Sequence, residues 1–300
     1  MGRLRLCYHR IMAVSPLPPS FPAAAMMGGQ TAAFRTLESL SALIAIGCLA
    51  GLALGLAAAV RPLVRSLPQV RRSSLLILLG LIAFHWLMVK PFVVHSIWHE
   101  HHGVSFVLTP EAALGTEGLI TLHGPTYALV MKSLSAAVFG RVSVFSLNYM
   151  VSLASVLFFF LFVCSVMGSA RLGLAAAAML LFLPAHTRLA ASECTFVMVE
   201  CFSVLTLLMF WLLHKTGRRL FFGLGLLSLL LLMHLRAEMF VLFPAVLAAH
   251  MAILGGRRAL KACVRPWFLF GMLAAALLAV SRFAGILSGD PRIAQWTRPQ

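Results

Sequence analysis

The chain has 300 residues, of which 61% are hydrophobic and 11% are charged, and its mean hydropathy is +0.97. A water-soluble domain carries about 25% charged residues, so lipid rather than water must cover most of this surface. Lys and Arg outnumber Asp and Glu by 24 to 8; beside long apolar runs this excess is typical of cationic cytoplasmic loops and excludes nucleic-acid binding as the leading interpretation.

About eight apolar runs have the length and composition of a membrane-spanning helix, which needs about 20 mostly apolar residues. In chain order these predicted spans are Leu40–Val60, Ser74–Val89, Val144–Met167, Leu172–Leu183, Thr195–Leu213, Leu220–His234, Met239–Leu254 and Phe268–Leu287. The run at Leu172–Leu183 is short, and we interpret it either as a span that extends into Pro184 or as an incomplete crossing. The predicted fold class is an all-α polytopic membrane protein.

Basic residues gather in alternate connections between these spans. They are Arg61, Arg65, Arg71 and Arg72, then Arg171, then Lys215, Arg218 and Arg219, then Arg257, Arg258, Lys261 and Arg265. The positive-inside rule places these connections in the cytoplasm. The acidic residues outside the spans fall on or near the opposite side: Glu38, Glu100, Glu111, Glu117, Glu193, Glu238 and Asp290. This asymmetry indicates that any chemistry takes place on the non-cytoplasmic face.

The sequence divides into three predicted regions. Residues 1–36 are a Pro/Ala-rich tail that we expect to be disordered, and residues 37–72 hold an extra span and a basic cytoplasmic loop. Residues 73–300 form the main transmembrane domain. Within it, the outer stretch Lys90–Ser143 contains two predicted helices that lie in the membrane interface, one starting near Thr109 and one following Gly124.

The segment His95–Gly103 holds four histidines and Glu100. Imidazole suits zinc, copper and iron, but the spacing matches no standard metal motif and the six cysteines show no CxxC pair, so no metal site is predicted. Glu100 is a candidate general base. The structural alternative is a polar loop in contact with water and lipid headgroups.

Further polar groups flank the later spans. One constellation is the segment Pro184–Glu193, which holds His186, Arg188 and Glu193 and precedes one span; the Glu193 carboxylate also suits a helix N-terminus. Glu200 lies inside that span, where an ionisable residue is a functional-site hypothesis by default; the alternative is a structural hydrogen bond to a neighbouring helix. Arg236, close to Glu238, can hold a phosphate or extend to lipid headgroups. The remaining candidates are His123 and Tyr127, in a turn, and Asn148, which can bond to another helix.

The order of these features is similar to that in membrane glycosyltransferases of the GT-C fold, in particular the protein mannosyltransferases and aminoarabinose lipid A transferases. The order is an acid in the first outer loop, His-x-Pro-x-Tyr at His123–Tyr127, a span opening near Asn148, Arg188 before Ser192-Glu193, and Arg236-Ala-Glu238. The resemblance covers roughly Ser74 to Leu254.

The resemblance implies a GT-C-like bundle that transfers a sugar from a polyprenyl-phosphate donor to a lipid, glycan or protein acceptor, outside the cytoplasm and at the plasma membrane. It implies that Glu100 is the general base, that Glu193 is the acid of the Ser-Glu motif, and that Arg188 and Arg236 lie near the phosphate. His123, Tyr127, Asn148 and Glu238 are the other expected substrate-binding residues. No cofactor is expected.

Three departures from the family pattern qualify these expectations. Gly124 replaces a proline after His123, and the first-loop acid is Glu100, Glu111 or Glu117 rather than Asp. Members of the family are also longer, which implies that this chain lacks their C-terminal part. The alternatives are a non-catalytic membrane scaffold or a transporter of lipid or small solutes.

Overall fold

The computed structural model describes residues 32–67, 70–89, 144–190 and 195–235, with Met239 and Leu273. Over these ranges the chain is helical and contains no strand. The helices are α3 (Ala32–Ser66), α4 (Arg72–Val89), α8 (Val144–Met167), α9 (Ala170–Leu181), α10 (Pro184–Ala190), α11 (Phe196–Thr216) and α12 (Arg219–Leu235). The chain divides into two compact units, Met1–Thr36 and Leu37–Gln300, and the packing below belongs to the second.

Four helices are long and apolar enough to cross a membrane: α3 over Ile46–Ser66, α4, α8 over Ser146–Met167, and α11. The helices α9 and α10 reach this length only together, and they are bent by 66° at the break between them. The prediction of an all-α, membrane-embedded chain is therefore confirmed for the described residues. The total number of spans and the GT-C arrangement stay predictions.

The predicted spans match the helices closely at α4, α8, α11 and α12. The helix α3 is longer at both ends than the predicted Leu40–Val60, because charged residues such as Arg61 and Arg65 end an apolar run without ending a helix. Apart from Met239 and Leu273, the predicted spans Met239–Leu254 and Phe268–Leu287 lie outside the described residues, as do the two interfacial helices of the outer loop and residues 1–31 of the predicted tail; residues 32–36 of that tail are the start of α3.

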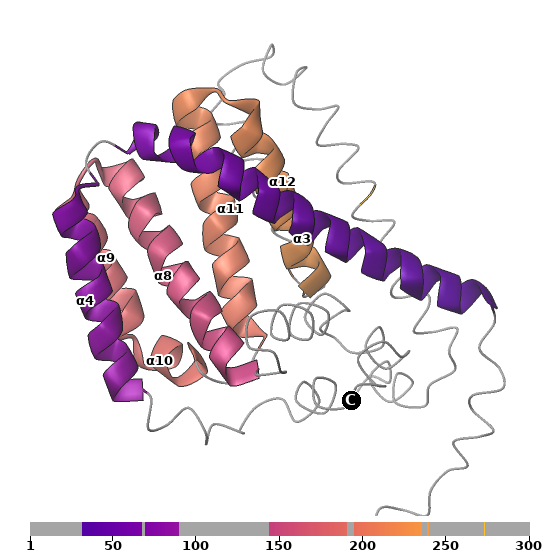
Figure 1. The fold of residues 1–300 in the computed structure, drawn as a ribbon, viewed down its shortest axis with the longest axis horizontal. Helices are drawn as coiled ribbons and strands as arrows, with labels where there is room; N and C mark the ends of the chain where they lie inside the picture. Colours follow the sequence, from indigo (N-terminus) through magenta and orange to yellow (C-terminus); the bar gives the residue numbers. More distant parts are fainter. Residues whose placement is uncertain are drawn as a thin grey trace, which may run out of the picture. The chain divides into compact units, whose positions relative to one another are not determined.

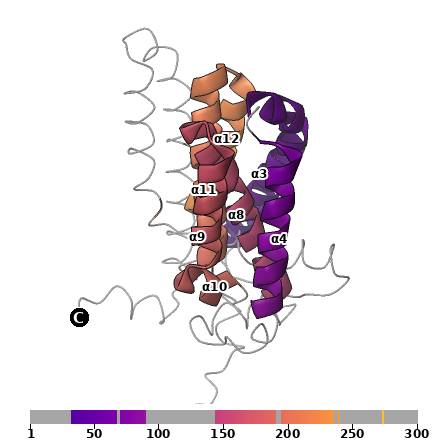
Figure 2. The ribbon, with the colours of Figure 1, turned by 90° about the vertical axis from the view of Figure 1, so that its left-hand side faces the viewer.

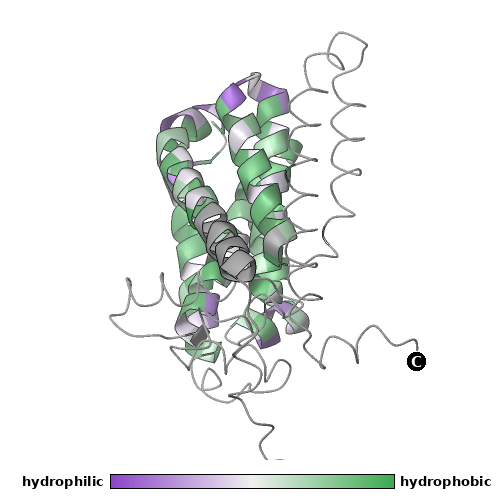
Figure 3. Ribbon diagram, turned by 90° about the vertical axis from the view of Figure 1, so that its right-hand side faces the viewer, coloured by the Kyte–Doolittle hydropathy of each residue, from purple (hydrophilic) through white to green (hydrophobic). Residues whose placement is uncertain are grey.

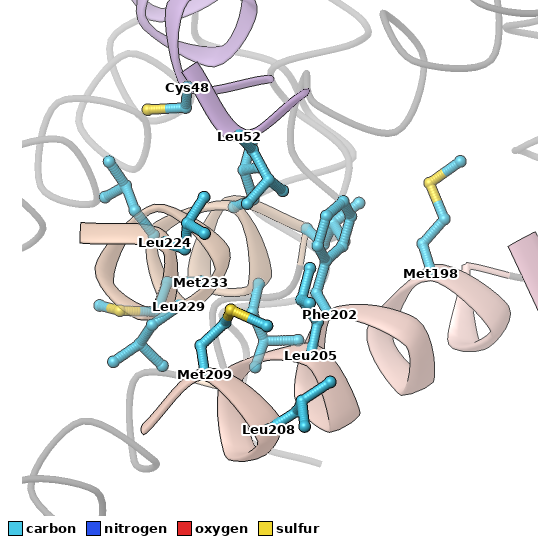
Figure 4. Close-up of a cluster of buried hydrophobic side chains, with 14 of the residues drawn as sticks. Cys48, Leu52, Met198, Phe202, Leu205, Leu208, Met209, Leu224, Leu229 and Met233 are labelled. Carbon is cyan, nitrogen blue, oxygen red and sulfur yellow. The ribbon is translucent and has the colours of Figure 1, made fainter. Parts of the chain in front are cut away.

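The helix α11 lies between α8 and α12, and α8 also packs against α9, which contacts α4 (Figures 1 and 2). Apolar side chains from α3, α8, α11 and α12 form the largest core cluster, with Leu208 and Leu212 of α11 fully buried (Figure 4). A second cluster joins α4, α8 and α9 around Phe160 and Cys164.

Buried hydroxyl groups link the helices at several levels of the bundle. Thr206 of α11 donates to Ser228 of α12 over 3.0 Å, and the Ser228 hydroxyl donates to the Phe202 carbonyl at the same distance. The indole of Trp211 donates to the Ser165 hydroxyl of α8 over 3.1 Å. In an apolar environment such bonds between small polar side chains hold helices in register.

The connections α8–α9 and α11–α12 are short turns that each use a left-handed glycine, with φ of 65° at Gly168 and 67° at Gly217. The Trp211–Ser165 bond places both turns at one end of the bundle. Val70, in the α3–α4 connection, packs on the same cluster as Ala170. The basic residues in these three connections and at the adjoining helix ends therefore share one end, called here the basic end: Arg61, Arg65, Arg71, Arg72, Arg171, Lys215, Arg218 and Arg219.

The surface follows the same division. Hydrophobic residues run along the lengths of the helices and hydrophilic residues gather near their ends (Figure 3). Large exposed apolar side chains, such as Leu76 and Leu87 of α4, cover the outside of the bundle where lipid would contact it. The opposite end contains the end of α4, the start of α8, all of α10 and the start of α11. We call it the outer end because the positive-inside rule predicts that it faces away from the cytoplasm.

We predict that the two ends face opposite sides of the membrane. Cysteine introduced at Ser169 or Arg218 should react with an impermeant maleimide only from the cytoplasm, because cationic turns stay inside. Cysteine at Ala185, exposed on α10, should react only from the other side. Labelling is measured in intact cells and in inverted vesicles, relative to the parent chain; labelling of all three positions from one side would contradict this topology.

We also predict that Gly173→Ala destabilises the contact between α8 and α9. A Cβ at this position would meet the Cys164 sulfur and lie 3.1 Å from the Phe160 carbonyl oxygen, so α9 would have to move away. Overpacking of this kind costs about 1–3 kcal/mol and should lower the melting temperature in detergent. The matched control is Gly223→Ala on α12, where nothing lies within 4 Å; equal melting temperatures for both variants would contradict the packing.

Candidate functional site

Only two of the predicted site residues have described side chains. Asn148 is fully buried near the start of α8, and Arg188 is exposed on α10. The other predicted site residues lie outside the described residues: Glu100, His123, Tyr127, Glu193, Arg236 and Glu238. The alternative first-loop acids, Glu111 and Glu117, lie there too, so these assignments stay predictions.

The outer end contains a chain of hydrogen bonds around the break between α9 and α10. The Thr187 hydroxyl lies 3.1 Å from the Leu181 carbonyl and 3.4 Å from Nε2 of His85. The other ring nitrogen of His85, Nδ1, lies 3.2 Å from the Tyr149 hydroxyl. The chain thus connects four helices, α4, α8, α9 and α10.

The direction of this chain follows from its last acceptor. The Leu181 carbonyl can only accept, so Thr187 donates to it and must accept the His85 Nε2–H. His85 Nδ1 then accepts from the Tyr149 O–H. Both nitrogens of His85 are satisfied, and its ring packs edge-on against Phe182 with centroids 5.7 Å apart. We therefore assign His85 a structural role, in which it holds the broken span together.

A second polar contact at the outer end joins α10 to α11. Nδ1 of His186 lies 3.1 Å from both carboxylate oxygens of Glu200, and the geometry of a hydrogen bond is met at Oε2. The His186 side chain is only 2% exposed, while that of Glu200 is 31% exposed. Glu200, the ionisable residue inside the predicted span, therefore bonds to a neighbouring helix, which is the structural alternative given for it from the sequence.

The pair nevertheless leaves polar atoms without partners. Among the described residues, neither His186 Nε2 nor Glu200 Oε1 has a hydrogen-bond partner, and both atoms are buried. A buried polar atom without a partner costs about 1–3 kcal/mol. Nδ1 faces the carboxylate and is the ring nitrogen that donates to it, so in a neutral ring Nε2 is the nitrogen that carries the lone pair. His186 therefore differs from His85, because one of its ring nitrogens, Nε2, has no hydrogen-bond partner among the described residues.

The helix α10 does not bring Arg188 and His186 together. The two residues are two positions apart, and such pairs do not face each other on a helix. His186 is directed toward Glu200, whereas Arg188 is exposed. The segment around Arg188 was predicted as one constellation, but the helical turn divides it into a buried side and an exposed side.

Sequence reasoning pointed to Glu200 and to the segment containing His186 without joining them. The two residues are 14 positions apart and lie on different helices. The available signal was the short run at Leu172–Leu183 followed by Pro184, which indicated a break in the span. A break turns the chain sharply, so residues after it can meet the next helix.

No known protein family, curated protein or solved structure matches this chain. Within the part of the chain that the structure describes, no group of three or more His, Cys, Asp or Glu side chains is placed to hold a metal ion. The site is therefore characterised by its own geometry.

We predict that Thr187→Val destabilises the outer end. Valine keeps the shape of threonine but leaves the Leu181 carbonyl and the His85 N–H without this partner, each at a cost of about 1–3 kcal/mol. The melting temperature in detergent should fall by several degrees. The matched control is Thr216→Val at the basic end, where the hydroxyl donates to the Leu212 carbonyl of its own helix and accepts from the N–H of Arg218 in the exposed turn. An equal or larger loss there would contradict the role of Thr187.

Proposed function

We propose that this protein transfers a sugar from a polyprenyl-phosphate donor to an acceptor on the non-cytoplasmic face of the plasma membrane. The observation that carries the proposal is the asymmetry of the bundle. Basic side chains gather at one end, and at the other the buried His186 is paired with the partly exposed Glu200, among helices whose outer surface suits lipid. Acid–base groups at the outer end suit a reaction with a lipid-linked substrate presented from the bilayer.

The chemistry of the transfer requires two kinds of group. A base must take the proton of the acceptor hydroxyl, and cations must stabilise the negative charge of the leaving polyprenyl phosphate. Arg188, exposed at the outer end, is suited to the phosphate because guanidinium binds it bidentately. The order of sequence motifs adds Glu100 and Glu193 as acids, and Arg236 as a second cation.

A transporter is the second candidate, and the broken span favours it. Discontinuous helices form the substrate and ion sites of many transporters, with polar groups beside the break. The 66° bend between α9 and α10 lies next to both His85 and His186. Uptake of solute into proteoliposomes, without any change in the lipid-linked sugars, would support this candidate over transfer.

The transferase proposal predicts that a donor lipid stays with the purified chain. Native mass spectrometry in detergent should find a polyprenyl phosphate or a polyprenyl-phosphate sugar. Arg188→Ala should reduce the retained fraction about tenfold, because a charge-assisted hydrogen bond contributes about 1.5–3 kcal/mol. Arg171→Ala, which removes an exposed arginine of the basic end, is the matched control. Retention of ordinary phospholipid only, in a folded sample, would contradict the proposal.

A further inference from the structure

His186 is the described group best prepared to move a proton. Its Nδ1 is bound to Glu200 over 3.1 Å, its side chain is 2% exposed, and its Nε2 has no partner among the described residues. A carboxylate on one ring nitrogen fixes the tautomer and the ring orientation, and leaves the other nitrogen to accept a proton. Catalytic bases are commonly oriented by a third group in this way.

We propose that His186, held by Glu200, is the general base that deprotonates the acceptor hydroxyl. The assignment rests on the transferase function proposed above, and it gives His186 the role that the family resemblance gives Glu100. Glu200 acts through His186 and is a positioning residue. Before the reaction, the hydroxyl group of the acceptor substrate donates a hydrogen bond to Nε2 of His186.

The proposed step balances as follows. The acceptor oxygen attacks the anomeric carbon of the donor sugar, and a new carbon–oxygen bond forms while the bond to the phosphate oxygen breaks. The bonding electron pair leaves with the polyprenyl phosphate. The hydroxyl proton passes to Nε2, and the resulting imidazolium is stabilised by the Glu200 carboxylate. The imidazolium then returns its proton to the released phosphate or to water.

The other two histidines with described side chains, His85 and His214, do not meet these requirements. Both nitrogens of His85 are occupied by Tyr149 and Thr187. His214 is exposed at the basic end, where its ring lies against Trp211. Nε2 of His186 has no exposed surface in this arrangement, so entry of the acceptor requires a movement of α10 or α11. The bend before α10 is the natural place for that movement.

The test uses the full chain in nanodiscs, a panel of polyprenyl-phosphate-linked hexoses and pentoses, and a total membrane extract as the source of acceptors. The readouts are release of polyprenyl phosphate and retention of donor by native mass spectrometry. His186→Gln should lower turnover by about 10²–10⁴-fold with donor retention unchanged, since a general base contributes that much. His214→Gln, the matched control, should stay within about threefold of wild type.

Two further variants separate a chemical role from a structural one. Imidazole added to His186→Ala should restore part of the lost turnover in proportion to its concentration, an effect that a merely structural histidine would not show. Glu200→Gln keeps an acceptor for Nδ1–H but removes the charge, and turnover should fall about tenfold or more with little change in KM. If His186→Gln does not fold, the turnover of Glu200→Gln tests the role of His186: a fall of about tenfold or more supports it, and unchanged turnover overturns it.

The outcomes distinguish the two proposals. An active wild type, with His186→Gln close to it and Glu100→Gln inactive, would overturn the role of His186 and leave the transferase function standing. A folded wild type that neither retains nor consumes any of the donors would overturn the function, and the role of His186 with it. Loss of turnover in His186→Gln, with rescue of His186→Ala by imidazole, supports both.

Discussion

The break between α9 and α10 is the constraint on which the outer end depends. Inside a membrane a backbone carbonyl without a partner is costly, so a helix can be interrupted only where another group replaces the lost bond. Thr187 supplies that group to the Leu181 carbonyl, and His85 and Tyr149 fix Thr187 in turn. Because the chain turns by 66° there, α10 runs against α8 and α11, and His186 meets Glu200. A continuous helix could not make this contact.

The two ends of the bundle carry different kinds of polar residue. The basic end carries exposed cations at helix ends and in short turns, and by the positive-inside rule we expect it to face the cytoplasm. The outer end carries polar groups that are buried, and one of them, His186, presents an open nitrogen. An ionisable group inside a membrane span costs free energy, so its presence at the end away from the cations is a functional-site hypothesis. The transfer reaction and the role of His186 are both proposals built on that division.

The helices were predictable because lipid demands long apolar runs. The run Val144–Met167 has the same bounds as α8, and α4, α11 and α12 differ from their predicted spans by a few residues. Hydropathy could not predict that α3 continues past Arg61, because hydropathy marks where an apolar run ends and a helix can continue through charged residues. Nor could hydropathy pair His186 with Glu200, because that contact depends on the angle between α9 and α10. The only signs of the break in the sequence are the short apolar run Leu172–Leu183 and Pro184 after it. Arg188 was grouped with its neighbours by proximity along the chain, and the helical turn separates them.

In the proposed mechanism Glu200 holds His186 in one tautomer and leaves Nε2 open. Nitrogen NMR of the full chain with ¹⁵N-labelled histidine tests it directly, with the His186 signals assigned by their loss in His186→Gln. We expect a protonated Nδ1 and an unprotonated Nε2 in the wild type, and a mixture of tautomers in Glu200→Ala. A protonated Nε2 with a bare Nδ1, unchanged by Glu200→Ala, would contradict it.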